Sequence, residues 1–465
     1  MSNMKFVDPL ITEKEKEHLK RAFNSGWLSS GPYVEKFEKK LSNTLGAKFG
    51  ISVNNGTNAI LLILMSLNLK KGDEIIVPSF CYISPVHMIK LMGLKPVPVD
   101  IRLDNLQIDT DQIANKVNKK TKAILLIHNY GSICNYEKII KIAKKKNIFV
   151  IEDTSEVILS KRYNDYVGNG KRFNKEKYLS YASFHASKTM ITGEGGVILT
   201  NSKKMCLRLK ILRNHGQKVN KPYYYNMTGG NFRLSNLLAS IGYSQILRSK
   251  KIIKKKTEIN SIYEKKLANN KNFTLMKDPN NFSPVRWGFP ILLKKQKDKK
   301  KIMKILNNKS TLCRPGFYSL NQLKHLDIYK NKISQKNDFK NAEIATKNVL
   351  VLPMNNKLSN SELNLICSKI ENYLGYIKNA GSIFLGFWSP EAMGDYITGS
   401  NHVLPTNGTA KFSSALSVFD FMKRVTITKV NKNGFKKLGP AVVRLADSEG
   451  LQAHSLSVSE RLKDL

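Results

Sequence analysis

The chain has 465 residues, 41% of them apolar and 24% charged, which is typical of a globular protein with two or three domains and excludes a disordered chain. The longest uninterrupted apolar run, residues 59–65, is far shorter than the about 20 residues of a membrane span, so a membrane protein is excluded. The 77 lysines and arginines outnumber the 35 acidic residues and give a net charge of +42, but only 13 of them are arginines. Because phosphate and base recognition relies on arginine, we interpret this charge as a lysine-rich solvated surface that suits an anionic small substrate, not nucleic acid.

Helical and strand-like segments alternate along the first part of the chain. In chain order, the apolar patterns predict a helix at 57–68, strands at 74–80 and 123–130, a helix at 136–146, and strands at 147–153, 181–187 and 195–200. This order predicts an α/β fold whose mainly parallel sheet is covered by helices on both faces. Ligands of such sheets bind beyond the carboxyl ends of the strands, so the residues that follow each strand are the first candidates for a site.

The composition changes near residue 378. Residues 379–465 hold ten basic and seven acidic residues, a net charge of +3, whereas residues 1–378 carry +39. We therefore predict a boundary there between parts of different origin. The N-terminus has no apolar segment like that of a secretory signal, and the five cysteines never form a CxxC pair, which predicts a cytoplasmic protein without a disulfide framework.

Two charged residues at predicted strand ends are candidate catalytic residues. Asp153 closes the strand at 147–153, where a partly buried acid needs a cationic or protonated partner, unless it only caps a following helix. Lys188 follows the strand at 181–187 and precedes a glycine-rich turn. A lysine held in such a cleft can act as a nucleophile toward a carbonyl, although taken alone, among 64 lysines, Lys188 fits a solvated surface residue better.

A third feature is the turn NNGTNA, which opens the predicted helix at 57–68. Gly56 allows the backbone to approach a ligand closely, and the amides of Thr57 and Asn58 can hold a phosphate at the helix N-terminus. A phosphate cradle, an acid for a ring nitrogen and a lysine amine together are what pyridoxal phosphate requires of a protein.

Residues 1–378 resemble the sugar aminotransferases of the DegT/DnrJ/EryC1/StrS group, a fold-type-I family that uses pyridoxal phosphate. The resemblance rests on seven motifs in order: GWLSSGPYVEKFEKKL, VNNGTNAILL, GDEIIVPSFCYIS, VIEDTSE, SFHASKTMITGEGG, LRNHGQ and GGNFRLSNLLASIG. It implies a large cofactor-binding domain at 1–247, a smaller α+β domain at 248–378 and an appended C-terminal fragment at 379–465. It also implies a homodimer.

The resemblance implies roles for individual residues. Lys188 is expected to bind the cofactor covalently and to move protons, and Asp153 to face the ring nitrogen. The other expected cofactor-binding residues are Gly56, Thr57, Asn58 and Ser183 at the phosphate, Tyr82 stacked on the ring, Glu156 near the phenolic oxygen, and Asn231 reaching the phosphate of the neighbouring subunit. Tyr82 has a plainer alternative as a core aromatic.

Two positions depart from the family pattern. The family commonly has glutamine where this chain has Glu156, and a carboxylate there would repel the phenolic oxygen unless it is protonated or differently placed. This leaves open a degenerate, non-catalytic fusion. After Arg314, which we take as a substrate residue, many members have a histidine where this chain has Asn321.

The lysine at position 188 favours transamination, since the members of the family that dehydrate sugars have histidine there. The strings LRNHGQ and TGEGG are most similar to the perosamine-synthase-like branch. The resemblance therefore implies transfer of an amino group from L-glutamate to a nucleotide-linked keto sugar of the 4-keto-6-deoxy kind, for surface polysaccharides. A non-catalytic polycationic binding protein is the alternative of another class.

Residues 380–465 resemble the C-terminal portion of histidinol dehydrogenase. By position, Asp395 and His454 resemble two zinc ligands of that enzyme, and His402 and Glu449 resemble residues that contact its substrate. The remaining ligands and a dinucleotide-binding region have no counterpart, while a zinc site needs about four ligands. We therefore expect at most a vestigial zinc site, and a residual zinc- and NAD-dependent activity stays an alternative.

Overall fold

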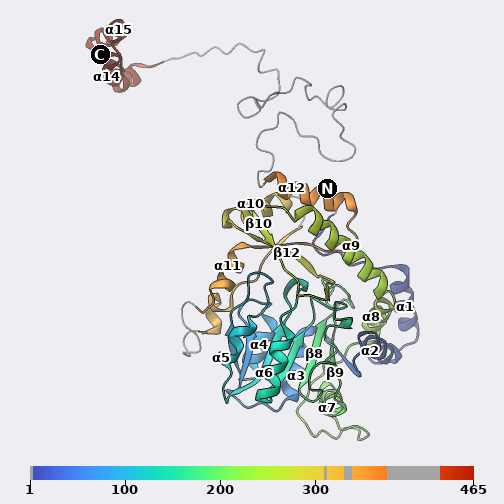
Figure 1. Cartoon of the computed structure of the whole chain (residues 1–465). Coiled ribbons are helices and arrows are strands. Elements are labelled where there is room, and N and C mark those ends of the chain that lie inside the picture. The colour runs from blue at the N-terminus through green and yellow to red at the C-terminus, as the bar shows by residue number, and fades with distance from the viewer. Residues whose placement is uncertain (1–3, 308–311, 329–337, 374–429, 465) are drawn as a thin grey trace. The chain divides into compact units, whose positions relative to one another are not determined.

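The computed structural model describes residues 4–307, 312–328, 338–373 and 430–464 (Figure 1). The chain divides into two units, residues 1–377 and 378–465. The further division of the first unit at residue 247 stays a prediction.

A seven-stranded sheet forms the centre of the first unit. Its order is β1 (Phe49–Val53), β9 (Gly196–Thr200), β8 (Tyr178–Ser183), β5 (Phe149–Asp153), β4 (Thr121–Ile127), β2 (Glu74–Pro78) and β3 (Lys95–Val99). Only β9 runs in the direction opposite to the other six strands of this sheet, so the expected mainly parallel α/β fold is confirmed. The predicted strands are all present with shifted ends, whereas β1 and β3 were missed.

Helices cover both faces of this sheet because successive strand residues point to opposite sides. On β2, for example, Ile75 and Val77 belong to one apolar cluster and Ile76 to another. The first face packs against α3 (Gly56–Ser66), α4 (Ser84–Leu91) and α7 (Lys203–Arg213). The second packs against α2 (Pro32–Leu45), α5 (Thr110–Lys116), α6 (Tyr136–Lys146) and α8 (Asn236–Leu247), and α1 (Glu13–Asn24) packs on α8.

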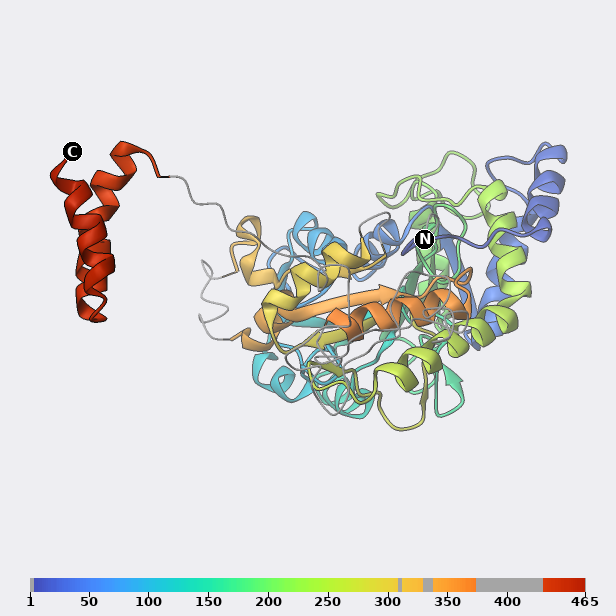
Figure 2. The same ribbon diagram turned by 90° about the horizontal axis from the view of Figure 1, so that it is seen from above.

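A second, antiparallel sheet lies in the C-terminal part of the first unit. Its order is β10 (Phe273–Leu275), β12 (Gly288–Leu293), β14 (Val349–Pro353) and β13 (Arg314–Pro315). Around it lie α9 (Ser249–Leu267), α10 (Gln296–Leu306), α11 (Lys340–Asn348) and α12 (Asn360–Tyr373), and α9 packs against α12 (Figure 2). A small sheet joins β11 (Phe282–Ser283), β6 (Lys161–Arg162) and β7 (Asp165–Tyr166), and short 3-10 helices lie at Asn129–Gly131, Leu320–Gln322 and Lys324–Leu326.

The described residues of the second unit form a helical hairpin. Helix α14 (Lys432–Ser448) packs against α15 (Gln452–Lys463), and the chain reverses at Gly450, whose φ of +72° favours glycine. None of the helices in the described ranges has the length and apolar character needed to cross a membrane.

Candidate active site

A cavity of about 500 Å³ opens at the carboxyl ends of the central parallel strands. The last residues of three adjacent strands line it, namely Ile127 of β4, Asp153 of β5 and Ser183 of β8. The N-terminus of α3 and the segment around Arg314 complete the wall. The cavity therefore lies where a parallel sheet is expected to bind its ligand.

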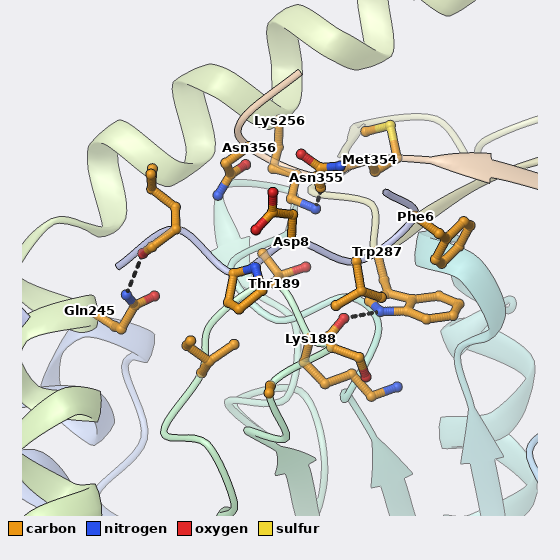
Figure 3. Close-up of a pocket in the computed structure, with 16 residues that line it drawn as sticks. Phe6, Asp8, Lys188, Thr189, Gln245, Lys256, Trp287, Met354, Asn355 and Asn356 are labelled. Carbon is orange, nitrogen blue, oxygen red and sulfur yellow. Dashed lines mark hydrogen bonds between the residues drawn. The ribbon is translucent and has the colours of Figure 1, made fainter. Parts of the chain in front are cut away.

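Lys188 lies in this cavity as half of an ion pair. Its Nζ is 3.0 Å from Oε1 of Glu156 and 4.8 Å from the centre of the Trp287 ring. Figure 3 shows Lys188 beside Trp287, whose Nε1 donates a 2.6 Å hydrogen bond to the Ser187 carbonyl. Glu156 also accepts a 2.7 Å hydrogen bond from the backbone of Tyr130. Lys188 is thus a largely buried, oriented amine and not a solvated surface lysine.

Asp153 is only 8% exposed and both of its carboxylate oxygens accept a hydrogen bond. Oδ1 accepts from the backbone N–H of Ser155 at 2.9 Å, and Oδ2 accepts from the hydroxyl of Tyr181 at 2.7 Å. Residues 154–159 do not form a helix, so Asp153 is not a helix cap. Its carboxylate lines the cavity.

The start of α3 forms the polar end of the cavity. Asn55 caps the helix by accepting a 2.8 Å hydrogen bond from the backbone of Asn58. Gly56 and Thr57 line the cavity, and a Cβ at Gly56 would lie 2.7 Å from the Cβ of Ser183, so only glycine permits this approach. Hydroxyls and free N–H groups at a helix N-terminus fit a phosphate.

The structure brings most of the predicted site residues together. Gly56, Thr57, Tyr82, Asp153, Glu156, Ser183, Lys188 and Arg314 all line the same cavity. Asn58 does not line it, since its backbone N–H and side chain are hydrogen-bonded to Asn55 and Asn54. Asn231 also lies outside the lining, where its Oδ1 accepts a 3.0 Å hydrogen bond from Arg233. The expected phosphate contacts of Asn58 and Asn231 stay predictions.

Tyr82 and Arg314 occupy the open side of the cavity. The Tyr82 ring is 57% exposed and meets Phe317 edge-on at 6.2 Å, so it is not a core aromatic. The Arg314 guanidinium lies 4.5 Å from the centre of the Phe6 ring, and burial lowers the pKa of Arg314 while Glu156 acts in the opposite direction. Asn321, the other departure, donates a 2.7 Å hydrogen bond to Glu343.

Sequence reasoning missed several residues of the cavity wall. They are His128, Tyr130, Tyr181, Trp287 and Phe317. His128 and Tyr130 follow β4 just as Asp153 ends β5, so their position after a strand was a usable signal. Trp287 and Phe317 are distant in sequence and carry no motif of their own.

A buried polar cluster on the other face of the sheet meets the cavity wall at His128. Glu152, adjacent to Asp153, contacts His128 Nε2 at 2.6 Å and accepts hydrogen bonds from the hydroxyls of Tyr136 and Tyr178. Burial and this carboxylate raise the pKa of both tyrosines well above the usual range, so both hydroxyls remain donors. Because successive side chains of β5 point to opposite faces of the sheet, Glu152 is a structural acid while Asp153 faces the cavity.

The predicted zinc ligands of the C-terminal fragment are only partly described. His454 lies on α15 and is exposed, and Glu449 follows α14. Asp395 and His402 fall outside the described residues. Within those residues, no group of three or more His, Cys, Asp or Glu side chains could hold a metal ion.

Comparison with protein families gives two matches. Residues 9–371 match the model of the DegT/DnrJ/EryC1/StrS aminotransferase family. Residues 318–462 match the model of histidinol dehydrogenase, which supports the predicted nature of the C-terminal fragment.

Individual relatives agree with the first match. GDP-perosamine synthase of Escherichia coli O157:H7 is 34% identical over 374 residues, which cover 80% of this chain and 99% of the relative. Two solved structures share the fold at 24% identity. The first is Helicobacter pylori PseC, an aminotransferase involved in pseudoaminic acid biosynthesis, with a TM-score of 0.73 over 79% of this chain and 98% of that one. The second is E. coli GDP-4-keto-6-deoxy-D-mannose-3-dehydratase with bound hydrated PLP, with a TM-score of 0.72 over 80% of this chain and 100% of that one.

Proposed function

Since the chain belongs to the DegT/DnrJ/EryC1/StrS aminotransferase family and is a pyridoxal-phosphate-dependent transaminase, we propose that it transfers the amino group of L-glutamate to a nucleotide-linked keto sugar. The observation that carries this proposal is the convergence of Lys188, Asp153 and the α3 N-terminus on one cavity. The chain's similarity to GDP-perosamine synthase favours a sugar linked to GDP, and the motif resemblance favours a 4-keto-6-deoxy sugar as the acceptor. The product would serve polysaccharide biosynthesis.

The cavity residues fit pyridoxal phosphate, which when bound supplies an electron sink for charge that develops at the substrate carbon. Gly56, Thr57 and Ser183 would hold its phosphate at the positive end of α3. Asp153 would hold the proton on the ring nitrogen. Lys188 would bind the cofactor through Nζ and then move the substrate proton as a general acid and base.

Glu156 has a role that a glutamine does not fill. Its 3.0 Å contact compensates the charge of Lys188 in a place where both side chains are largely buried. The backbone N–H of Tyr130 donates a hydrogen bond to the other oxygen of this carboxylate and so helps to direct it at the lysine. We assign Glu156 to holding the Lys188 amine in the cavity until the cofactor arrives.

Arg314 is the residue we assign to substrate recognition. Within the part of the chain that the structure describes, its guanidinium stacks on Phe6 and Trp287 but has no hydrogen bond or ion pair. A planar fork of donors in a partly desolvated wall suits a carboxylate. We therefore propose that Arg314 binds the α-carboxylate of L-glutamate.

The proposed enzyme is a homodimer in which Asn231 reaches the partner's cofactor phosphate. This part of the proposal rests on the family resemblance and on the position of Asn231 outside its own cavity. Sedimentation of the holoenzyme tests it, and a monomer with full activity would contradict it.

The replacement of Lys188 by alanine tests the proposal. The wild-type protein should show visible absorbance with pyridoxal phosphate, and reduction with borohydride should attach the cofactor to Lys188, as mass spectrometry can show. Lys188→Ala should lose the covalent attachment, and its turnover rate should fall by at least about a thousandfold, because the substitution removes the nucleophile and the general base. Lys204→Ala, at an exposed lysine of α7, is the matched control. A Lys188→Ala variant that transaminates at the wild-type rate would refute the assignment, and a wild type that never binds cofactor would point to a degenerate fusion.

A further inference from the structure

The hydroxyl of Tyr181 has a position that packing alone does not require. Tyr181 lies on β8 with its side chain only 2% exposed, and its hydroxyl donates a 2.7 Å hydrogen bond to Oδ2 of Asp153. The aromatic ring belongs to the apolar cluster on one face of the central sheet. A phenylalanine would fill the same space, so the hydroxyl is the part that needs an explanation.

The hydrogen bond acts on a carboxylate with little solvent around it. Among the described residues, Asp153 has no ion pair, and its other oxygen accepts only the backbone N–H of Ser155 at 2.9 Å. A hydrogen bond donated to a carboxylate stabilises the charged form. Burial and the nearby Asp153 raise the pKa of Tyr181 well above its usual range, so the hydroxyl stays protonated and remains the donor.

The carboxylate retains capacity for a ligand. Two carboxylate oxygens offer about four acceptor positions, of which Tyr181 and Ser155 occupy two. We propose that Tyr181 is a positioning residue whose hydrogen bond holds the Asp153 carboxylate aimed at the ring nitrogen of the cofactor. This inference rests on the proposed function, since it assumes that Asp153 is the partner of that nitrogen.

The same strand supplies a matched control. Tyr178 is also buried on β8, but it points to the opposite face of the sheet and its hydroxyl donates to Glu152. Tyr178→Phe and Tyr181→Phe therefore delete the same atom from the same strand. Only the second deletion removes a hydrogen bond to Asp153.

The experiment measures the dissociation constant of pyridoxal phosphate for the full-length protein. Without the Tyr181 hydroxyl, the Asp153 carboxylate loses one of its two hydrogen bonds and is no longer held toward the ring nitrogen. Tyr181→Phe should therefore weaken cofactor binding about tenfold. Tyr178→Phe should lower the melting temperature but leave the dissociation constant unchanged.

A double substitution separates positioning from a general loss of structure. In an Asp153→Asn background, Tyr181→Phe should have no further effect on cofactor binding, because the carboxylate it acts on is gone. A dissociation constant of Tyr181→Phe that equals that of the wild type would overturn the inference and leave the proposed function intact. An equal loss of cofactor binding on Tyr181→Phe in the wild-type and Asp153→Asn backgrounds would also overturn the inference. A wild type that binds no cofactor at any pH would overturn the proposed function itself.

Discussion

At the scale of single residues, Glu156 is where the chain departs from the family pattern inside the cavity. Its carboxylate holds the Lys188 amine at 3.0 Å, so the lysine must leave this ion pair before it can react. Glu156→Gln keeps the shape of the side chain but removes its charge. We expect protein stripped of cofactor to take up pyridoxal phosphate about tenfold faster in this variant, because less free energy is needed to release the amine.

The growth of visible absorbance after mixing with pyridoxal phosphate measures this rate. Glu137→Gln, at an acid of α6 outside the cavity, controls for the loss of one negative charge. An unchanged or slower uptake in Glu156→Gln would show that the ion pair does not limit loading.

Arg314 permits a prediction that separates the two substrates. If its guanidinium binds the carboxylate of the amino donor, Arg314→Gln should weaken the binding of L-glutamate in the first half-reaction on the order of tenfold. The rate of the second half-reaction, started from the pyridoxamine form with keto sugar, should change less than about twofold. Single-turnover absorbance measures both, and Arg102→Gln, at an exposed arginine paired with Asp104, is the control. Loss confined to the keto-sugar half-reaction would instead assign Arg314 to the nucleotide diphosphate.

At the scale of the elements, the junction of α9 with β14 contains a buried lysine. Lys256 is 4% exposed and its Nζ donates to the carbonyl of Met354, next to a small cavity of about 30 Å³ that also borders Lys188 (Figure 3). The acid that lines this cavity, Asp8, is paired with Lys357 at 2.6 Å. Burial without an acidic partner lowers the pKa of Lys256 from 10.5 to about 7.

This pKa makes Lys256 contribute to the pH dependence of stability. Between about pH 7 and 10.5 the unfolded chain binds a proton at Lys256 that the folded chain does not, so the contribution of Lys256 to stability rises with pH in this window. The slope is about 1.4 kcal/mol per pH unit. Lys256→Met should be more stable than the wild type at pH 7, and the difference should shrink as the pH rises to 9. Melting temperatures at several pH values measure this, and a constant difference would contradict the lowered pKa.

The elements also show how far sequence reasoning reaches. β2 and β4, which contain runs of Ile, Val and Leu, were predicted because a buried parallel strand is apolar on both faces. β14 (VLVLP), an antiparallel strand of the second sheet, was not predicted. β3 (KPVPV) was missed because its two prolines disfavour a strand, and the structure places it at the edge of the sheet, where proline is tolerated.

For the site, the residues that adjoin strand ends or the first turn of α3 were predicted, since topology brings such positions to one edge. Trp287 and Phe317 reach the same cavity from the second sheet region. Their position depends on how the C-terminal part of the unit folds back, which no local pattern in the sequence records. The Tyr181 contact also needs the register of β5 and β8, in which Asp153 pairs with Tyr181.

At the scale of the whole molecule, the described residues that line the cavity lie between Asn55 and Val351. The first family match ends at residue 371, and the E. coli relative is covered over 99% of its length by 80% of this chain. We therefore expect the C-terminal fragment to be dispensable for transamination. The described part of that fragment contributes two helices that pack on each other.

A truncated chain of residues 1–377 tests this separation. We expect it to keep the visible absorbance of the bound cofactor and to transaminate within about twofold of the full chain, because it retains every described residue that lines the cavity. Circular dichroism must show that the truncated chain is folded. A folded truncated chain that binds no pyridoxal phosphate would mean that the fragment supports the catalytic unit. Activity equal to that of the full-length chain would mean that the histidinol-dehydrogenase-like fragment takes no part in transamination.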